Sequence, residues 1–306
     1  MEQFDPIEYR VFECITGSKL YGTDTPDSDL DTRGVIIPPM EVMIDPFMRF
    51  EVKDGFDGED RALYDLGKFM NLAADCNPNI VELLFVPDQL VLFKKDVWEK
   101  VVAHRHLFLS KNVKHRFLGY AISQLEAIKR HRQWFIDPPD REPTRAEYGL
   151  EQTPSVSMAW LHSMKQTMNY QLLRPEFVEE IRKEEAYRDA HRKWENYRMW
   201  QSKRNPKRRG TEEEYGYDTK YASHLFRLLS EGRELLLTGK ITFPLPNAEW
   251  LLAIKNGLYD YDDILALAQD AESDFDRWYA ESPLPDKPDR NALKSIYYDI
   301  VLRSRR

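Results

Sequence analysis

Residues 16–35 read TGSKLYGTDTPDSDLDTRGV, and this stretch decides the fold that we expect for the chain. Residues 11–15 before it and residues 35–37 at its end are rich in apolar and β-branched side chains, which is typical of strands. Between them Gly17 and Ser18 allow a sharp turn into a short helix, and such a turn points backbone N–H groups outward. The stretch therefore predicts two strands joined through a Gly-Ser turn, with phosphate as the ligand that suits the turn.

Two aspartates, Asp29 and Asp31, stand ten or more residues after Ser18. An extended segment points alternate side chains to one face, so both carboxylates and Arg33 are expected to share that face. Hard divalent cations such as Mg²⁺ bind through one or two carboxylates plus substrate phosphates. An isolated Asp-x-Asp is common in turns, but this one follows Gly-Ser and leads into a strand. The pattern predicts a site for Mg²⁺, with Mn²⁺ as the alternative ion, and Arg33 either holds phosphate or neutralises the acidic pair.

The composition of the chain excludes several classes of protein. The 306 residues include 44 Lys and Arg against 52 Asp and Glu, and 42% of all residues are hydrophobic, a mixture typical of one or two globular domains. We expect no export signal and no membrane span, and therefore a cytoplasmic protein. The net charge of −8 limits any nucleic-acid contact to a local patch. Cys14 and Cys76 have no metal-binding spacing, so reduced thiols are expected.

Helical patterns dominate the chain after the first strands. Four apolar residues at helical spacing predict an amphipathic helix that begins at Leu63 and ends before Asn77. Beyond about residue 95 strand signals become rare. A last helix is expected to begin near Asn291. Residues 137–143 are rich in proline and predict a break.

The order of these motifs resembles the DNA polymerase beta nucleotidyltransferase superfamily, whose signature is Gly-Gly/Ser followed by Asp-x-Asp. Residues 61–69 and 220–228 are also similar to a phage and bacterial branch of it, the RNA repair pathway polymerase beta family. The resemblance implies an α+β fold, in which residues 1–100 form a catalytic core of a small mixed β-sheet with flanking helices. Residues 101–306 would form a mostly α-helical domain that completes the nucleotide cleft, with a variable insertion around 137–185.

The superfamily uses a third carboxylate on a following strand. Asp60 is our choice for it and Glu59 is the second candidate, whereas Asp65 is expected to be a charge at a helix N-terminus. The resemblance implies that Asp29, Asp31 and Asp60 are catalytic and hold one Mg²⁺, and that the first two hold a second. It also implies that Gly17, Ser18 and Arg33 bind the nucleotide.

A second group of candidate nucleotide ligands lies in residues 216–229. Lys220, His224 and Arg227 are spaced at i, i+4 and i+7 and are expected to share one helical face, with Asp218 as the N-cap. Charged helix faces are usually only solvated. The resemblance to the Lys-x-x-x-His-x-x-Arg-Leu helix of the branch favours instead a face that meets the triphosphate.

A local basic patch occupies residues 182–209, which contain eleven Lys and Arg against four Asp and Glu. Tyr187, Trp194, Tyr197 and Trp200 are interleaved with these cations. Cations that neutralise phosphates beside rings that stack on bases are typical of single-stranded RNA binding, although a charged helix with core aromatics fits equally well. The candidate RNA contacts are Arg192, Lys193, Arg198, Lys203, Arg204 and Arg208.

The expected function is that of a template-independent nucleotidyltransferase that moves NMP from a nucleoside triphosphate to an RNA end, tRNA-like or broken, in RNA repair. One alternative keeps the transfer but moves it to a protein hydroxyl or a small molecule, because the fold does not specify the acceptor. Another alternative is a non-catalytic module that binds RNA or nucleotide. The presence of all three candidate carboxylates argues against that last alternative.

Overall fold

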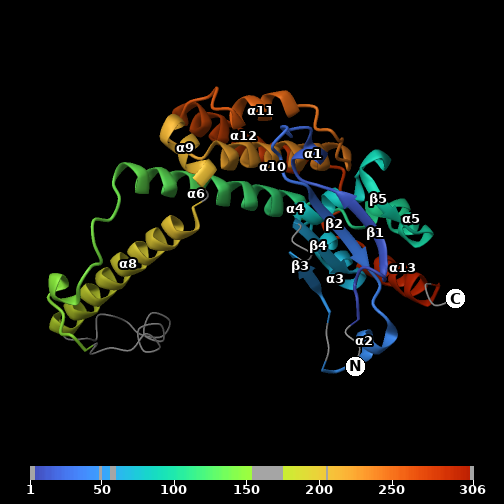
Figure 1. The fold of residues 1–306 in the computed structure, drawn as a ribbon, viewed down its shortest axis with the longest axis horizontal. Coiled ribbons are helices and arrows are strands. Elements are labelled where there is room, and N and C mark those ends of the chain that lie inside the picture. The colour runs from blue at the N-terminus through green and yellow to red at the C-terminus, as the bar shows by residue number, and fades with distance from the viewer. Residues whose placement is uncertain (1–3, 48–49, 56–59, 154–174, 205, 304–306) are drawn as a thin grey trace. The chain divides into compact units, whose positions relative to one another are not determined.

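A computed structural model describes residues 4–47, 50–55, 60–153, 175–204 and 206–303 (Figure 1). The chain forms two compact units. Unit 1 combines Met1–Ile128 with Asp218–Arg306, and unit 2 is Lys129–Tyr217. The expected insertion around 137–185 falls within unit 2, and its residues 154–174 lie outside the described part. The domain division expected at residue 100 stays a prediction.

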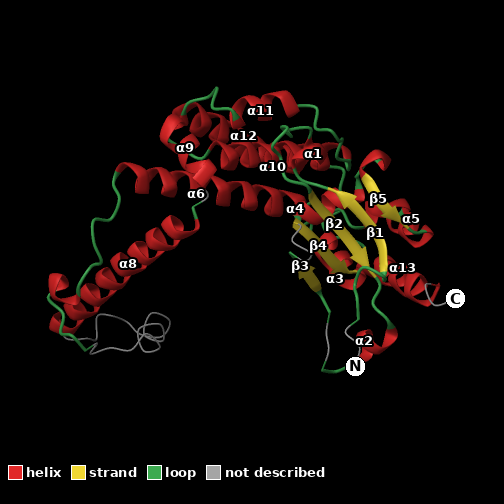
Figure 2. Cartoon of the chain, viewed as in Figure 1, coloured by secondary structure: helices red, strands yellow, loops and turns green. Residues whose placement is uncertain are grey.

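Unit 1 contains the expected small mixed sheet, whose strand order is β3-β4-β2-β1-β5 (Figure 2). The strands are β1 (Arg10–Ile15), β2 (Asp31–Ile36), β3 (Val52–Asp54), β4 (Asp60–Asp65) and β5 (Val91–Lys94). β2 and β4 are parallel, whereas the other neighbouring pairs are antiparallel. The strands expected on either side of the Gly-Ser turn are present as β1 and β2, although β2 begins at Asp31, four residues before the expected start, and ends at Ile36.

Helices account for most of the remaining described residues. The helices of unit 1 are α1 (Ser18–Tyr21), α2 (Met40–Ile44), α3 (Leu66–Ala74), α4 (Pro78–Val81), α5 (Asp96–Ala103), α10 (Thr219–Thr238), α11 (Ala248–Lys255), α12 (Tyr261–Glu281) and α13 (Arg290–Arg303). α6 (Gly119–Ile136) contributes residues to both units, and unit 2 also contains α8 (Pro175–Lys203) and α9 (Pro206–Tyr215). The last helix begins one residue before the expected Asn291.

The junction between β4 and α3 differs from the sequence expectation. A helix start at Leu63 is wrong, because β4 continues to Asp65 and pairs with β2 along its whole length. The Asp65 side chain accepts a hydrogen bond from the backbone N–H of Lys68 at 3.0 Å and so caps α3. Asp65 is therefore a helix N-terminal carboxylate, as expected, and the helical spacing of Leu63 with Leu66 is accidental.

Aromatic packing fixes the sheet against its helices. The ring of Phe12 on β1 stacks on Trp98 of α5 with centroids 4.1 Å apart, and Phe69 of α3 meets the same indole edge-on at 5.1 Å. In the C-terminal part of unit 1, Phe226 of α10 packs edge-on against Trp250 of α11 at 5.0 Å. Within the part of the chain that the structure describes, no helix combines the length and apolar character that a membrane crossing needs.

Candidate active site

The Gly-Ser turn lies directly against the first candidate metal ligand. β1 ends at Ile15, and the backbone N–H of Thr16 donates to the carbonyl oxygen of Asp31 at 2.9 Å. Gly17 then adopts φ 66°, and α1 begins at Ser18. A Cβ atom placed on Gly17 would lie 2.0 Å from Oδ2 of Asp31. The glycine is therefore required both by its backbone angle and by its contact with the carboxylate.

Gly17→Ala is expected to reduce nucleotide transfer by about two orders of magnitude, because the added methyl group must displace the Asp31 carboxylate by about 1 Å. The matched control is Gly55→Ala, since Gly55 has a similar φ of +62° but no atom within 4 Å of its Cβ position. Initial rates and melting temperatures of both variants separate the contact from backbone strain. Equal losses of activity in the two variants would contradict the contact.

Two candidate catalytic carboxylates are brought side by side by the parallel pairing of β2 with β4. Asp31 is the first residue of β2, Asp60 is the first residue of β4, and the two are register partners. Asp31 is half-buried, whereas Asp60 and the preceding Asp29 are exposed. Glu59, the second candidate for the third carboxylate, lies outside the described residues. The topology therefore places Asp60, our choice for the third carboxylate, next to Asp31.

The electrostatics of Asp31 favour a cation at this position. Burial raises the pKa of the Asp31 carboxyl, and the hydrogen bond and negative charge of Asp60 raise that pKa further. The positive charges of Arg33 and Lys220 act in the opposite direction on it. Carboxylate oxygens are the donors that Mg²⁺ and Mn²⁺ prefer, and a bound cation would remove the repulsion between the pair. The pair of Asp31 and Asp60 thus fits a divalent metal ion, whereas the structure does not bring the Asp29 carboxylate within 4.8 Å of both.

Arg33 is anchored beside the carboxylates. Its side chain donates from Nη1 to the carbonyl oxygen of Asn79 in α4 at 3.2 Å, which fixes the guanidinium against a neighbouring helix. Its charge still acts on Asp31. A guanidinium held in this way is suited to donate its remaining N–H groups to a phosphate oxygen as well.

The three residues expected to share one face of α10 have different environments. The Asp218 side chain accepts from the backbone N–H of Tyr221 at 3.0 Å, so the expected N-cap is confirmed. Lys220 is exposed and acts electrostatically on Asp31, and His224 is half-buried. Arg227 is only 5% exposed. The single polar face expected for α10 therefore ends before Arg227.

A buried charge network surrounds Arg227. Its guanidinium forms ion pairs with Glu82 and, at 2.9 Å, with Glu231, and it lies 4.4 Å from the ring centroid of Tyr21. The Tyr21 hydroxyl donates to Glu82 at 2.9 Å. Glu82 and Glu231 are both fully buried. The network ties α10 to the helix that follows Gly17, and a role of Arg227 through Tyr21 fits this burial better than contact with phosphate.

A lysine that the sequence did not single out lies beside the same turn. Lys255 of α11 donates from Nζ to the carbonyl oxygen of Thr23 at 3.0 Å. Burial and the positive charge of Lys220 lower the pKa of Lys255, while Asp24 raises it. The only sequence signal for Lys255 is a basic residue at the end of an amphipathic helix, which is too common to indicate a site.

The candidate RNA contacts lie in unit 2. Arg192, Lys193, Arg198 and Lys203 are exposed residues of α8, Arg204 follows that helix, and the side chain of Arg208 lies outside the described residues. Two of these cations have carboxylate partners, since Arg192 pairs with Asp189 at 2.7 Å and Arg204 pairs with Glu212. Lys193, Arg198 and Lys203 therefore present the charge that is most available to an external anion.

An aromatic cluster accompanies these cations. Trp134 of α6 and Trp200 of α8 have ring centroids 5.5 Å apart, and Tyr197 lies 5.8 Å from Trp200. The guanidinium of Arg204 covers the Trp200 ring at 4.7 Å, and that of Arg198 lies 5.8 Å from the ring of Trp194. The four rings are half-exposed, so they combine helix packing with surface that a base could reach.

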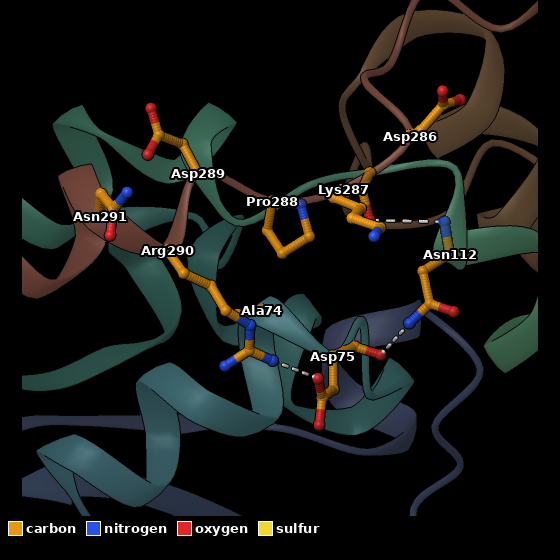
Figure 3. Close-up of a pocket in the computed structure, with 10 residues that line it drawn as sticks. Ala74, Asp75, Asn112, Asp286, Lys287, Pro288, Asp289, Arg290 and Asn291 are labelled. Carbon is orange, nitrogen blue, oxygen red and sulfur yellow. Dashed lines mark hydrogen bonds and ion pairs between the residues drawn. The ribbon is translucent and has the colours of Figure 1, made fainter.

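A pocket of about 490 Å³ elsewhere in unit 1 includes none of the expected site residues (Figure 3). In its lining, Arg290 forms an ion pair with Asp75 at 2.6 Å, and Asn112 donates to the Asp75 carbonyl oxygen at 3.0 Å. These polar groups satisfy one another, so the pocket gives no indication of a ligand.

Together, the sheet topology, the Gly-Ser turn and the paired carboxylates define a polymerase beta-like nucleotidyltransferase core. The chain belongs to the RNA repair pathway DNA polymerase beta family, which it matches over residues 1–299. An uncharacterized 38.9 kDa protein in the nrdC-mobD intergenic region of Enterobacteria phage T4 is 25% identical over 291 residues, covering 85% of this chain and 86% of the phage protein. No solved structure matches the chain significantly.

Proposed function

We propose that the protein is a nucleotidyltransferase that moves NMP from a nucleoside triphosphate to the terminal hydroxyl of RNA without a template. The observation that carries the proposal is the position of Asp31. It is the register partner of Asp60 on the neighbouring parallel strand, and its carboxylate lies against Gly17. Polymerase beta-like nucleotidyltransferases generally use divalent metal ions, and the carboxylate pair is suited to hold them. We place the activity in the cytoplasm of a bacterium or of a phage-infected host.

In this proposal Asp29, Asp31 and Asp60 hold one Mg²⁺ or Mn²⁺ ion, and Asp29 with Asp31 hold a second. Bound metal would polarise the acceptor hydroxyl and neutralise phosphate charge. The backbone around Gly17 and Ser18, with Arg33 and Lys220, would orient the triphosphate.

The reaction needs no covalent protein intermediate. The acceptor oxygen attacks the α-phosphorus, the bond from that phosphorus to the bridging oxygen breaks, pyrophosphate leaves with the bonding electrons, and the hydroxyl proton passes to water. The protein contributes positioning and electrostatic stabilisation.

The test incubates the pure protein with each α-labelled nucleoside triphosphate, Mg²⁺ and total RNA, protein extract or metabolite extract. Label in RNA that is lost in Asp29→Ala/Asp31→Ala is the expected result. Label in protein or in small molecules would show that RNA is not the acceptor, while the proposed transfer of NMP would still stand. Binding of nucleotide or RNA without any label would identify a non-catalytic module instead.

RNA is proposed as the acceptor because unit 2 combines available cations with half-exposed rings on α8. The family description also names an RNA repair pathway. Phosphates would meet Lys193, Arg198 and Lys203, and unpaired bases would stack near Tyr197 and Trp200.

Lys193→Gln/Arg198→Gln is expected to weaken binding of single-stranded RNA and to reduce the salt dependence of that binding. Each lost phosphate contact removes about 0.7 from the slope of log K against log salt, so two contacts remove about 1.4. Titrations at several salt concentrations measure this change. The control is Arg277→Gln/Lys287→Gln in unit 1, which should leave the slope as it is. A slope that changes equally in both double variants would contradict an RNA surface on α8.

A further inference from the structure

Two lysines are held close together by two helices of unit 1. Lys220 lies in the first turn of α10, and Lys255 is the last residue of α11. The hydroxyl of Thr219 donates to the backbone carbonyl oxygen of Lys255 at 2.8 Å, so the start of one helix is tied to the end of the other. The positions of both lysines therefore depend on helix backbones rather than on a loop.

The Lys255 ammonium group is directed to the segment that follows α1. Its Nζ atom donates to the carbonyl oxygen of Thr23 at 3.0 Å, and Thr23 is 6% exposed. Thr23 in turn donates its backbone N–H to the carbonyl oxygen of Ser18 at 2.9 Å. Lys255 is thus joined through one residue to the Gly-Ser turn that lies against Asp31.

The two lysines lack a carboxylate partner among the residues that the structure describes. Lys255 contacts a neutral carbonyl oxygen, and no described ion pair within 4.0 Å includes Lys220 or Lys255. Their mutual repulsion contributes to the lowered pKa of Lys255, after the larger effect of burial. Asp24 acts on Lys255 and Asp31 acts on Lys220, but both carboxylates lie beyond ion-pair distance. Two adjacent ammonium groups without a carboxylate in contact cost electrostatic energy that a bound polyanion would recover.

We propose that Lys220 and Lys255 together bind the β- and γ-phosphates of the nucleoside triphosphate and the pyrophosphate that leaves. This proposal rests on the proposed function, because it assumes that the α-phosphate lies at the carboxylates. Lys220 acts electrostatically on Asp31, and Lys255 reaches the segment after the Gly-Ser turn. A polyphosphate that spans from the carboxylates to the lysines would therefore meet cations at both ends, metal ions held by the carboxylates and the two ammonium groups.

The experiment measures binding of inorganic pyrophosphate and Mg²⁺ to the full chain by calorimetry, without an acceptor. Lys255→Gln keeps a donor for the Thr23 carbonyl oxygen but removes the charge, and it is expected to raise the dissociation constant at least about tenfold. Lys240→Gln is the matched control, since Lys240 is an exposed lysine beyond the other end of α10, and it should bind pyrophosphate as the wild type does.

Lys255→Arg keeps the charge and is expected to bind within a few-fold of the wild type. If Lys255→Gln binds as tightly as the wild type, or if Lys255→Arg loses as much affinity as Lys255→Gln, the lysine pair is not the polyphosphate site and the proposed transfer still stands. A wild type that binds neither pyrophosphate nor any nucleoside triphosphate would overturn the proposed function and this inference together.

Discussion

Asp31→Asn is expected to slow nucleotide transfer by at least about a thousandfold while the fold is retained. An amide is a poor ligand for a hard divalent cation, and metal ions supply several kcal/mol of transition-state stabilisation, of which each 1.36 kcal/mol is worth a factor of ten. The substitution keeps the size of the side chain beside Gly17. Initial rates at saturating Mg²⁺ and nucleotide measure the effect. A variant with more than a tenth of the wild-type rate would exclude Asp31 as an essential metal ligand.

The same variant is expected to be at least as stable as the wild type at neutral pH. Burial and Asp60 raise the pKa of Asp31 above its ordinary value of 3.8, so the folded chain binds this proton more tightly than the unfolded chain does. The free energy of unfolding of the wild type therefore falls as pH rises from that value through the raised pKa. Asp31→Asn removes this penalty.

Urea denaturation without metal between pH 4 and pH 8 measures the difference in stability. Adding Mg²⁺ should stabilise the wild type and leave Asp31→Asn almost unchanged, because a ligand stabilises only the state that binds it. A metal-free variant that is less stable than the wild type at pH 7 would show that Asp31 has a structural role.

The parts of the molecule that the sequence predicts well depend on local signals. The strands before and after the Gly-Ser turn follow from short apolar runs, and the N-cap of α10 follows from Asp218 standing before a helical pattern. The parallel register places Asp60 beside Asp31, and the role of Asp60 as the third carboxylate, which the resemblance implies, stays a prediction.

The parts that the sequence misses depend on contacts between distant residues. The pairing of β4 with β2 overrides the helical spacing that begins at Leu63. Periodicity places Arg227 on the same helix face as Lys220. However, the Arg227 guanidinium is buried against Glu82, which is 145 residues away in the chain. Lys255 reaches Thr23 across 232 residues. No local pattern contains such information.

Arg227→Met is expected to lower the free energy of unfolding by about 3–5 kcal/mol, the usual cost of removing one partner from a buried ion pair. Glu82 and Glu231 are fully buried, and the substitution leaves both carboxylates without their cation. Urea denaturation at pH 7 measures the loss. If Arg227 instead bound the nucleotide, Arg227→Met would weaken nucleotide binding and change the free energy of unfolding little.

Substitutions of the two carboxylates separate these roles of Arg227. Glu231→Gln is expected to destabilise the fold less than Arg227→Met does, because Glu82 still neutralises the guanidinium and an amide oxygen can accept the hydrogen bond that Glu231 accepts. Arg227→Met/Glu82→Gln/Glu231→Gln should recover much of the stability lost in Arg227→Met, because no uncompensated charge remains buried. If Arg227→Met folds with wild-type stability and binds nucleoside triphosphate poorly, the guanidinium contacts the substrate, as the resemblance implied. If stability is lost and restored in this series, Arg227 acts by holding Tyr21, and with it the helix that follows Gly17, in place.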